Sequence, residues 1–312
     1  MTTDKQRISL IVPVFNEEEV LNEFKTRIDG LMNDSSFEWE VIFVNDGSVD
    51  KSLKILKNFH QQDPRIKIIS FSRNFGHQIA ITAGINEAMG DAVVVMDADL
   101  QDPPEIIRDF IKKWQEGYEV VYGVRKARLG ETWFKKQTAA WYYMLIHWLS
   151  GVDIPENVGD FRLIDRKIVE VLKDSPEQHR FIRGLVAWAG FNQIGIEVER
   201  AARFAGKTKY PYKKLIRMAL DSVVSFSILP LRLATLTGII AALCSFIVLI
   251  WTLVERFIYR GVIQGWASLM TVVLFLGSAQ LITIGILGEY IGRNFQESKK
   301  RPLYIIKEKV GF

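Results

Sequence analysis

Two carboxylates follow a short apolar segment that has the character of a buried strand. In VVVMDADLQDPPE, residues 93–105, four apolar residues come first, and Asp97 and Asp99 then stand two positions apart. Residues two apart on an extended chain point to the same side, so both carboxylates would face the same space. Two like charges this close raise each other's pKa unless a cation lies between them. The spacing therefore predicts a divalent-metal site, and oxygen ligands with room for phosphate suit Mg²⁺ or Mn²⁺.

A D-x-D pattern can also belong to a solvated loop, so the elements that would position it matter. The first 125 residues alternate short β-branched segments with amphipathic ones. The pattern predicts strands over residues 8–14, 39–46, 66–72 and 91–97, and helices over residues 18–32, 50–59, 78–89 and 104–115. Near-continuous apolar strands that alternate with helices indicate an α/β fold with a parallel sheet covered on both faces.

Polar clusters follow all four predicted strands and favour the functional interpretation of the D-x-D. In chain order they are FNEE, NDGS, SRN and DADLQD. Open α/β sheets bind ligands beyond the carboxyl ends of their strands, so we expect one crevice to gather all four clusters. A metal there would neutralise a diphosphate leaving group, while Asp46 and Glu17 would accept hydrogen bonds from a base or ribose. We interpret Arg73 and Asn74 as bracing residues and His77 as structural rather than catalytic.

Several classes of protein are excluded by what the sequence lacks. No G-x-G-x-x-G follows the first strand and no G-x-x-x-x-G-K-[ST] occurs, which excludes a dehydrogenase and a P-loop protein. The single cysteine, Cys244, excludes an internal disulfide and a cysteine-based zinc site, and the four histidines lack metal-ligand spacing. A net charge of +4 is too small to indicate a nucleic-acid partner. The N-terminus runs straight into a strand, so we expect no signal peptide.

Five motifs in this order resemble the family 2 glycosyltransferases that act on polyprenyl phosphates. They are IVPVFNEE, VNDGS, SRNFG, MDADLQDPPE and GDFRLIDR. Dolichyl-phosphate mannose synthase and the bacterial bactoprenol glucosyltransferases belong to this family, and the resemblance is greater to the latter. It extends to the tail segment GEYIGRNFQESKKRPLYII. The resemblance implies a GT-A nucleotide-sugar-binding domain over residues 1–210, built on a mostly parallel sheet and followed by two transmembrane helices.

The resemblance also implies roles for individual residues. The divalent metal, Mg²⁺ or Mn²⁺, would be bound by Asp97, Asp99 and Gln101. The nucleotide sugar would be contacted by Pro13, Phe15, Glu17, Asp46, Asp97 and Arg203. The acceptor phosphate would be held by Arg125, Lys135 and Lys209. One position departs from the pattern, because Ala139, with Thr138 beside it, stands where some relatives carry a small hydroxyl residue.

Asp160 lies in GDFRLIDR, where family 2 enzymes carry their catalytic acid, so the resemblance implies a catalytic group of Asp160, Asp99 and Arg125. A polyprenyl phosphate is mostly a dianion at neutral pH, with a second pKa near 6, and therefore needs no strong general base. We predict that Asp160 acts as a base or orients the acceptor during an inverting, in-line transfer. The alternative is a structural ion pair, for which Arg162 is the candidate partner.

Two uncharged segments of 22 residues, 233–254 and 266–287, predict transmembrane helices. At about 1.5 Å per residue, each spans roughly 33 Å, enough for a hydrocarbon core. The connector carries two basic residues and the tail, residues 288–312, carries six, so the positive-inside rule predicts cytoplasmic termini and a cytoplasmic catalytic domain. We expect a multi-pass protein of the inner (plasma) membrane. Two buried helices of a soluble domain are the alternative.

An amphipathic helix is predicted over residues 211–232, before the first span. Its apolar face includes Leu215, Met218 and Phe226, and basic residues lie opposite, which favours a helix lying on the lipid headgroups. A core-packed helix is the alternative. The basic segment upstream, RFAGKTKYPYKK, would meet anionic headgroups, and the resemblance makes its Arg203 and Lys209 candidates for phosphate contacts.

The predicted function is inverting transfer of a hexose, glucose from UDP-glucose, to undecaprenyl phosphate at the cytoplasmic membrane face. The product would be a lipid-linked sugar donor for cell-surface glycan modification. The same chemistry with GDP-mannose or a UDP-amino sugar stays open, as does an inactive membrane-tethered nucleotide-binding scaffold. A processive polysaccharide synthase is disfavoured, because two spans are few for a channel and no Q-x-x-R-W motif occurs.

The C-terminal segment RPLYIIKEKVGF has a strand-like core at residues 303–306. Such a segment can add to the sheet edge of a neighbouring subunit and make a homo-oligomer. The alternative is that the segment docks on the sheet of its own chain.

Overall fold

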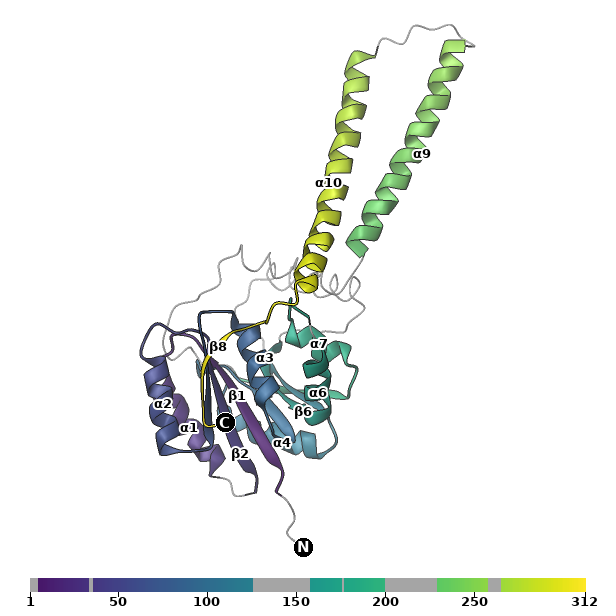
Figure 1. Cartoon of the computed structure of the whole chain (residues 1–312). Coiled ribbons are helices and arrows are strands. Elements are labelled where there is room, and N and C mark those ends of the chain that lie inside the picture. The colour runs from purple at the N-terminus through teal and green to yellow at the C-terminus, as the bar shows by residue number, and fades with distance from the viewer. Residues whose placement is uncertain (1–4, 34–35, 126–157, 176, 200–228, 258–264) are drawn as a thin grey trace. The chain divides into compact units, whose positions relative to one another are not determined.

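The computed structural model describes residues 5–33, 36–125, 158–175, 177–199, 229–257 and 265–312. The chain divides into two compact units. The first comprises residues 1–148, 152–212 and 302–312, and the second comprises residues 149–151 and 213–301. Figure 1 shows the first as a sheet covered by helices and the second as a pair of long helices.

The first unit is built on an eight-stranded sheet with the order β7-β5-β6-β4-β1-β2-β3-β8. The strands are β1 (Arg7–Val14), β2 (Glu38–Asn45), β3 (Ile66–Phe71), β4 (Ala92–Val95), β5 (Val120–Arg125), β6 (Val158–Asp165), β7 (Gln193–Val198) and β8 (Ile306–Val310). Strands β3, β2, β1 and β4 pair in parallel, as do β5 and β7. Strand β6 is antiparallel to both β4 and β5, and β8 is antiparallel to β3. The mostly parallel sheet predicted from the sequence is therefore confirmed.

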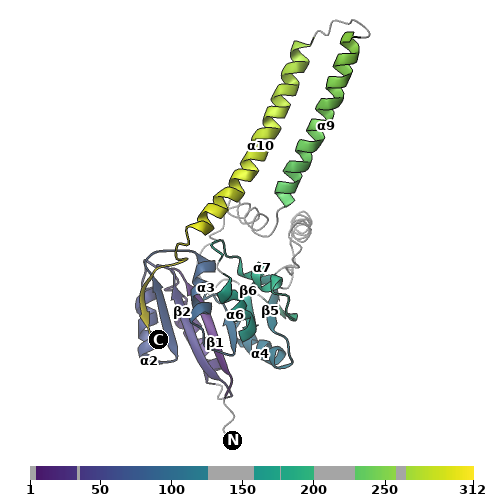
Figure 2. The same cartoon turned by 45° about the vertical axis from the view of Figure 1, so that its right-hand side comes forward.

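Helices cover both faces of this sheet, as near-continuous apolar strands require. They are α1 (Leu21–Met32), α2 (Ser52–Gln62), α3 (His77–Glu87), the short 3₁₀ helix η1 (Pro104–Ile106), α4 (Ile107–Gln115), α6 (Arg166–Asp174) and α7 (Ile182–Trp188). Helices α1, α2 and α4 share one buried apolar cluster with alternate residues of the strands. Helices α3 and α6 pack against the opposite face, and α7 packs on α6 (Figure 2).

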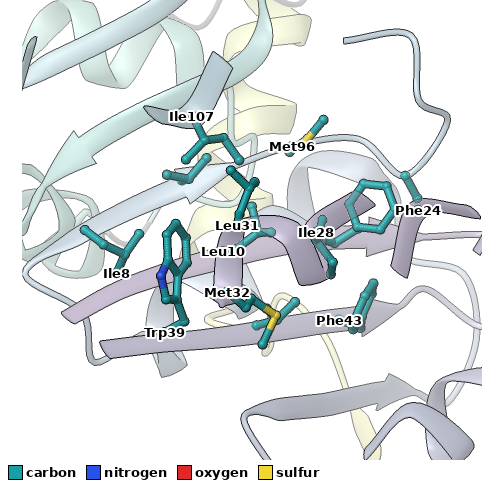
Figure 3. Packing of buried hydrophobic residues seen from close by; sticks show 14 of the residues in the cluster. Ile8, Leu10, Phe24, Ile28, Leu31, Met32, Trp39, Phe43, Met96 and Ile107 are labelled. Carbon is teal, nitrogen blue, oxygen red and sulfur yellow. The ribbon is translucent and has the colours of Figure 1, made fainter. Parts of the chain in front are cut away.

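The alternation of side chains along the strands decides which helices each residue meets. Ile8 and Leu10 of β1 and Phe43 of β2 face α1. There they belong to the same buried cluster as Phe24 and Ile28 of that helix (Figure 3). Ile11 points the other way, towards Gly84 of α3. A Cβ on Gly84 would lie 2.3 Å from Cγ2 of Ile11, so α3 can approach the sheet this closely only with glycine there.

The second unit contains α9 (Leu229–Phe257) and α10 (Trp266–Ser298), of 29 and 33 residues. Both predicted spans lie inside these helices, and α10 continues beyond the predicted end at residue 287. Each helix is long and apolar enough to cross a membrane. Their large apolar side chains are exposed, for example Ile247 at 65% and Leu281 at 72%, which is the pattern of helices that meet an apolar solvent. Of the predicted interfacial helix, only residues 229–232 lie within the described residues, and they belong to α9.

Strand β8 lies on the sheet of its own chain. It covers the edge of β3, where Ile68 pairs with Val310 and Phe71 with Ile306. The strand therefore begins where the predicted core at 303–306 ends, and the self-docking alternative describes what the structure shows. Two ion pairs reinforce the pairing, Lys57–Glu308 at 2.8 Å and Lys309–Glu87 at 2.7 Å.

Tyr304, just before β8, anchors the tail next to the loop that follows β3. Its ring stacks on Phe71 with centroids 5.0 Å apart, and its hydroxyl oxygen accepts a hydrogen bond of 3.1 Å from Nδ2 of Asn86 on α3. Phe71 in turn meets the ring of Phe75 edge-on at 5.6 Å. The tail thus supports Phe75, whose backbone belongs to the site described below.

Replacing Tyr304 tests this anchor. Tyr304→Ala removes the stack and should lower the free energy of unfolding by about 1–3 kcal/mol, since an aromatic pair contributes about 0.5–1.5 kcal/mol beyond its burial. Tyr304→Phe keeps the stack and should cost no more than about 1 kcal/mol, the value of one hydrogen bond. Thermal unfolding of the purified protein measures both. Equal losses in the two variants would show that the stack does not anchor the tail.

Candidate active site

Four loops meet at one edge of the sheet because the four strands that lead into them are parallel neighbours. Strands β3, β2, β1 and β4 are adjacent, and their carboxyl ends point the same way. The polar clusters that follow these strands therefore lie along a single edge, as predicted. Pro13, buried in β1, pairs in register with Val44 of β2. Phe15 follows Val14, the last residue of β1, and is 36% exposed.

The loops after β1 and β2 hold each other through side-chain-to-backbone hydrogen bonds. The backbone N–H of Asn16 donates to Oγ of Ser48 at 3.0 Å, and that of Val49 donates to Oδ1 of Asn16 at 2.9 Å. The N–H of Glu17 donates to Oγ of Ser52 at 3.0 Å. Asn16 has a φ of 55°, a left-handed conformation that asparagine tolerates better than most residues. These contacts set the positions of Phe15 and Glu17.

Asp46 joins the loop after β2 to the loop after β3. Its buried carboxylate accepts hydrogen bonds from the backbone N–H groups of Phe75, at 2.6 Å, and Gly76, at 3.0 Å. Burial raises the pKa of Asp46, although these two hydrogen bonds oppose the rise. Gly47 follows with a φ of +68°, and a Cβ there would lie 2.4 Å from the carbonyl carbon of Arg73. Only glycine at position 47 lets the two loops approach this closely. The nucleoside contact from Asp46 stays a prediction.

The D-x-D segment begins where the sheet ends. Strand β4 stops at Val95, and the N–H of Met96 still donates to the carbonyl of Ile11, so Asp97 is the first residue free of the ladder. The chain then turns at Leu100, which has a φ of 57°. The N–H of Gln101 donates to Oδ1 of Asp99 at 3.1 Å.

Negative charge is concentrated around Asp97, whose side chain is 32% exposed. Burial raises the pKa of the Asp97 carboxyl, and the nearby carboxylates of Asp160, Asp99 and Asp102 add to the rise, while His77 opposes it. An added cation would relieve this repulsion. Gln101 lies two residues after Asp99 in the sequence, and its side chain is buried. Its amide oxygen is another hard ligand.

The residues present fit a cation that draws many of its ligands from substrate. Among the described residues, no group of three or more His, Cys, Asp or Glu side chains is arranged to hold a metal ion. Mg²⁺ typically binds through one or two carboxylates and fills its remaining positions with water and substrate phosphates. Asp97 and Asp99 supply that number of carboxylates, so a metal site completed by a diphosphate agrees with the chemistry of the donor set.

Asp160 is held by three side chains, those of Arg183, His77 and Gln78. It lies on β6 and is 8% exposed. Its Oδ1 accepts a hydrogen bond from Nε of Arg183 at 2.7 Å, and its Oδ2 accepts one from Nη2 of Arg183 at 3.1 Å. Nε2 of His77 and Nε2 of Gln78 lie 3.1 and 3.2 Å from the same Oδ2 oxygen. Burial opposes ionisation, but Arg183 and His77 outweigh it and hold the pKa of Asp160 well below its usual value.

The ion-pair partner of Asp160 is Arg183 rather than Arg162, which was the candidate partner from the sequence. Arg162 is buried on the same strand and donates from Nη2 to the carbonyl of Gly159 at 3.0 Å. Burial lowers the pKa of its guanidinium to about 10. Arg162 therefore lies near Asp160 without forming the predicted pair.

His77 connects the D-x-D segment to Asp160. Its Nε2 lies 3.4 Å from Oδ1 of Asp97 and 3.1 Å from Oδ2 of Asp160. Burial lowers the pKa of the imidazole, but Asp97 and Asp160 more than offset this and raise it to about 9. The side chain interpreted as structural thus bridges two predicted functional carboxylates.

Gln78 and Arg183 are site residues that the sequence reasoning missed. Gln78 follows His77 directly, so its proximity to the SRNFG motif was a usable signal. Arg183 lies 23 positions after Asp160, and no local pattern links the two. Of the remaining predicted residues, Arg125 ends β5. Lys135, Arg203 and Lys209 lie outside the described residues, as do Thr138 and Ala139.

Comparison with known proteins adds the family context. Residues 9–173 match the family described as "Glycosyl transferase family 2", and residues 229–293 match the "GtrB C-terminal hairpin". The uncharacterized glycosyltransferase YkcC of Bacillus subtilis is 49% identical over 97% of this chain and 94% of its own length. The prophage bactoprenol glucosyl transferase homolog of Escherichia coli K12 is 44% identical, over 96% of this chain and 98% of its own length.

The bactoprenol glucosyl transferase of Shigella phage SfV is 43% identical, with the same two coverages of 96% and 98%. Among solved structures, glucosyl-3-phosphoglycerate synthase from Mycobacterium tuberculosis, crystallised with Mn²⁺, UDP and glucosyl-3-phosphoglycerate, is 15% identical with a TM-score of 0.48. The match covers 70% of this chain and 78% of that one. This similarity is too low to transfer a ligand.

The bridging role of His77 predicts a pH dependence of stability in chelator-treated protein. The folded pKa of about 9 exceeds the ordinary 6.5, so the stabilisation is fully present below pH 6.5 and is lost as the pH rises through 9. The melting temperature should fall over this interval by a few degrees more in the wild type than in His77→Gln. His179→Gln, at an exposed position, is the matched control. The same pH profile in His77→Gln and wild type would refute the bridge.

Proposed function

Because the chain belongs to glycosyl transferase family 2 and is therefore a glycosyltransferase, we propose that it transfers glucose from UDP-glucose to undecaprenyl phosphate. The observation that carries this proposal is the similarity to bactoprenol glucosyl transferases at 43–44% identity over nearly the full length of both chains. The similarity includes both the domain that contains the site and the two-helix hairpin. A common arrangement of catalytic domain and helices supports a common type of acceptor.

The edge formed by β1, β2 and β4 suits the donor. In this proposal Phe15, Glu17 and Asp46 contact the nucleoside, and Asp97, Asp99 and Gln101 hold Mg²⁺ or Mn²⁺. A bound divalent cation would supply positive charge for the diphosphate leaving group. The raised pKa of Asp97 supports this role, since a carboxylate among like charges gains most from a neighbouring cation.

The acceptor side requires positioning more than proton transfer. A polyprenyl phosphate oxygen arrives mostly ionised at neutral pH. It would form a bond to the anomeric carbon while the bond from that carbon to the donor diphosphate breaks and its electron pair leaves with UDP. In-line attack inverts an α-linked donor to a β-linked lipid phosphate. We assign the acceptor phosphate to Arg125, Lys135 and Lys209, the donor diphosphate to Arg203, and the orientation of the acceptor to Asp160.

The chain's connectivity supports a membrane hairpin. Residues 152–212, which precede the second unit's helices, and residues 302–312, which follow them and include β8, both belong to the first compact unit. If both helices cross the bilayer, the catalytic unit and the end of α10 must therefore lie on the same side. The excess of Lys and Arg after α10 supports the cytoplasmic side, where sugar nucleotides are available. The predicted interfacial helix, without residues 229–232 that belong to α9, would lie on the headgroups and complete this arrangement.

Two alternatives to this function concern the identity of the donor and the presence of turnover. The proposed metal ligands Asp97, Asp99 and Gln101 would serve the diphosphate that all these donors share, so GDP-mannose or a UDP-amino sugar is the alternative donor. The inactive nucleotide-binding scaffold is disfavoured, because the chain belongs to a family of glycosyltransferases. The site retains Asp97, Asp99 and Asp160 together, which favours turnover.

A transfer assay tests the donor and the metal together. Membranes containing the protein, given undecaprenyl phosphate and radiolabelled UDP-glucose, should yield a labelled lipid, and EDTA should abolish it. Asp97→Ala and Asp99→Ala should each lower turnover by about 10²–10³-fold, the usual loss when charge stabilisation of a transition state is removed. Label transferred only from GDP-mannose or a UDP-amino sugar would reject UDP-glucose, and transfer insensitive to EDTA would reject the metal.

Asp160→Asn tests the acceptor-orienting role. The amide keeps the size of the side chain but loses its charge, so kcat should fall by about 10²-fold while the KM for the donor changes by less than about threefold. Asp109→Asn, an exposed substitution on α4, is the control and should match the wild type. Unchanged turnover in Asp160→Asn would end the assignment.

A further inference from the structure

We propose that Arg183 is a positioning residue of the transfer reaction, which acts by holding the Asp160 carboxylate in one orientation. This inference rests on the proposed function, because it concerns the orientation of the acceptor by Asp160. It adds a residue from α7 to a site whose other described members lie on strands, follow the strand ends or begin α3.

The geometry of the contact is that of a fork on a carboxylate. Nε and Nη2 of Arg183 donate to the two different oxygens of Asp160, at 2.7 and 3.1 Å. Nη1 of the same guanidinium donates to the carbonyl of Val158 at 3.0 Å, two residues before Asp160 on β6. Three bonds from one planar group to one strand leave Arg183 and Asp160 little rotational freedom.

Gln78 fixes the helix from which Arg183 projects. Its Oε1 accepts from the backbone N–H of Ile182, the first residue of α7, at 3.1 Å, while its Nε2 donates to Asp160. Helix α3 thus contacts Asp160 itself and the backbone of Ile182, the residue before Arg183. An amide N–H at the start of α7 has no partner within the helix, so this bond also satisfies an otherwise open donor.

The distribution of donors indicates which oxygen is left for substrate. Among the described residues, Oδ2 of Asp160 receives three donors, from Arg183, His77 and Gln78. Oδ1 receives one, from Nε of Arg183. A carboxylate offers about four acceptor positions, two on each oxygen. Oδ1 is therefore the oxygen with capacity for a further contact, and the fork of Arg183 sets the direction in which it points.

This arrangement favours an orienting carboxylate over a general base. A base works best when its pKa lies near the operating pH, whereas Arg183 and His77 hold the pKa of Asp160 well below its usual value. A phosphate acceptor that is already ionised gives such a base no proton to remove. A lysine at position 183 could supply the charge but only a single point contact, so it would orient the carboxylate poorly.

A double-mutant cycle of Asp160→Asn and Arg183→Gln tests the proposal, with kcat for lipid glycosylation and the melting temperature as separate readouts. Arg183→Gln should lower kcat by about 10²-fold with the donor KM within about threefold of wild type. Arg183→Lys should recover part of the loss. Because Arg183 acts through Asp160, the double variant should have a kcat within about threefold of Asp160→Asn alone.

Arg180→Lys is the matched control, since Arg180 is a buried arginine of the same segment that donates only to backbone carbonyls among its described contacts, those of Leu172 and Ser175. It should lower the melting temperature and leave kcat within about twofold of wild type. If the losses in kcat from the two single substitutions multiply in the double variant, or if Arg180→Lys loses as much kcat as Arg183→Lys, the positioning role is wrong.

The melting temperatures separate this inference from the proposed function. The cycle in melting temperature reports the Arg183–Asp160 contact whether or not a sugar is transferred. If the effects of the two substitutions on the melting temperature are non-additive but the wild-type protein yields no labelled lipid, the proposed function is rejected and the Arg183–Asp160 pair has only a structural role. Normal wild-type transfer with uncoupled kcat values would reject the positioning role alone.

Discussion

The repulsion among carboxylates at the carboxyl edge of the sheet is the constraint on which the site depends. Burial and the carboxylates of Asp160, Asp99 and Asp102 raise the pKa of Asp97, and the neighbouring cationic side chains stabilise Asp97 and Asp160 unevenly. Arg183 and His77 stabilise the ionised form of Asp160, whereas the pKa of Asp97 stays raised despite His77. In the proposed function, Arg183 and His77 would neutralise the carboxylate on the acceptor side, and a bound divalent cation would neutralise those on the donor side.

The fold supports this division through contacts between loops rather than through the strands alone. Asp46 uses its carboxylate to hold the backbone of Phe75 and Gly76, and that loop leads directly into His77 at the start of α3. Tyr304 stacks behind the same loop through Phe71. The C-terminal tail thus supports residues that are more than 200 positions away in the sequence.

Prediction from the sequence worked where local periodicity decides structure. The four parallel strands, their helices, the site edge and the two long apolar helices were all predicted, because each depends on the spacing of apolar residues within one segment. The strands β5, β6 and β7 were not predicted, since they form the mixed half of the sheet, where pairing partners lie far apart in the chain. The end of β4 at Val95 was placed two residues too late, because the run of apolar residues continues past the last ladder pair.

By itself, the sequence determined the family, the parallel core and the spacing of Asp97 and Asp99, because motifs and periodicity are properties of contiguous residues. Only the tertiary structure decided that Arg183, and not the nearby Arg162, pairs with Asp160. It also decided that His77 lies between two carboxylates and that β8 covers the edge of β3. These contacts join residues from different elements, and the free energy that selects among them comes from packing and burial of charge, which no local pattern records.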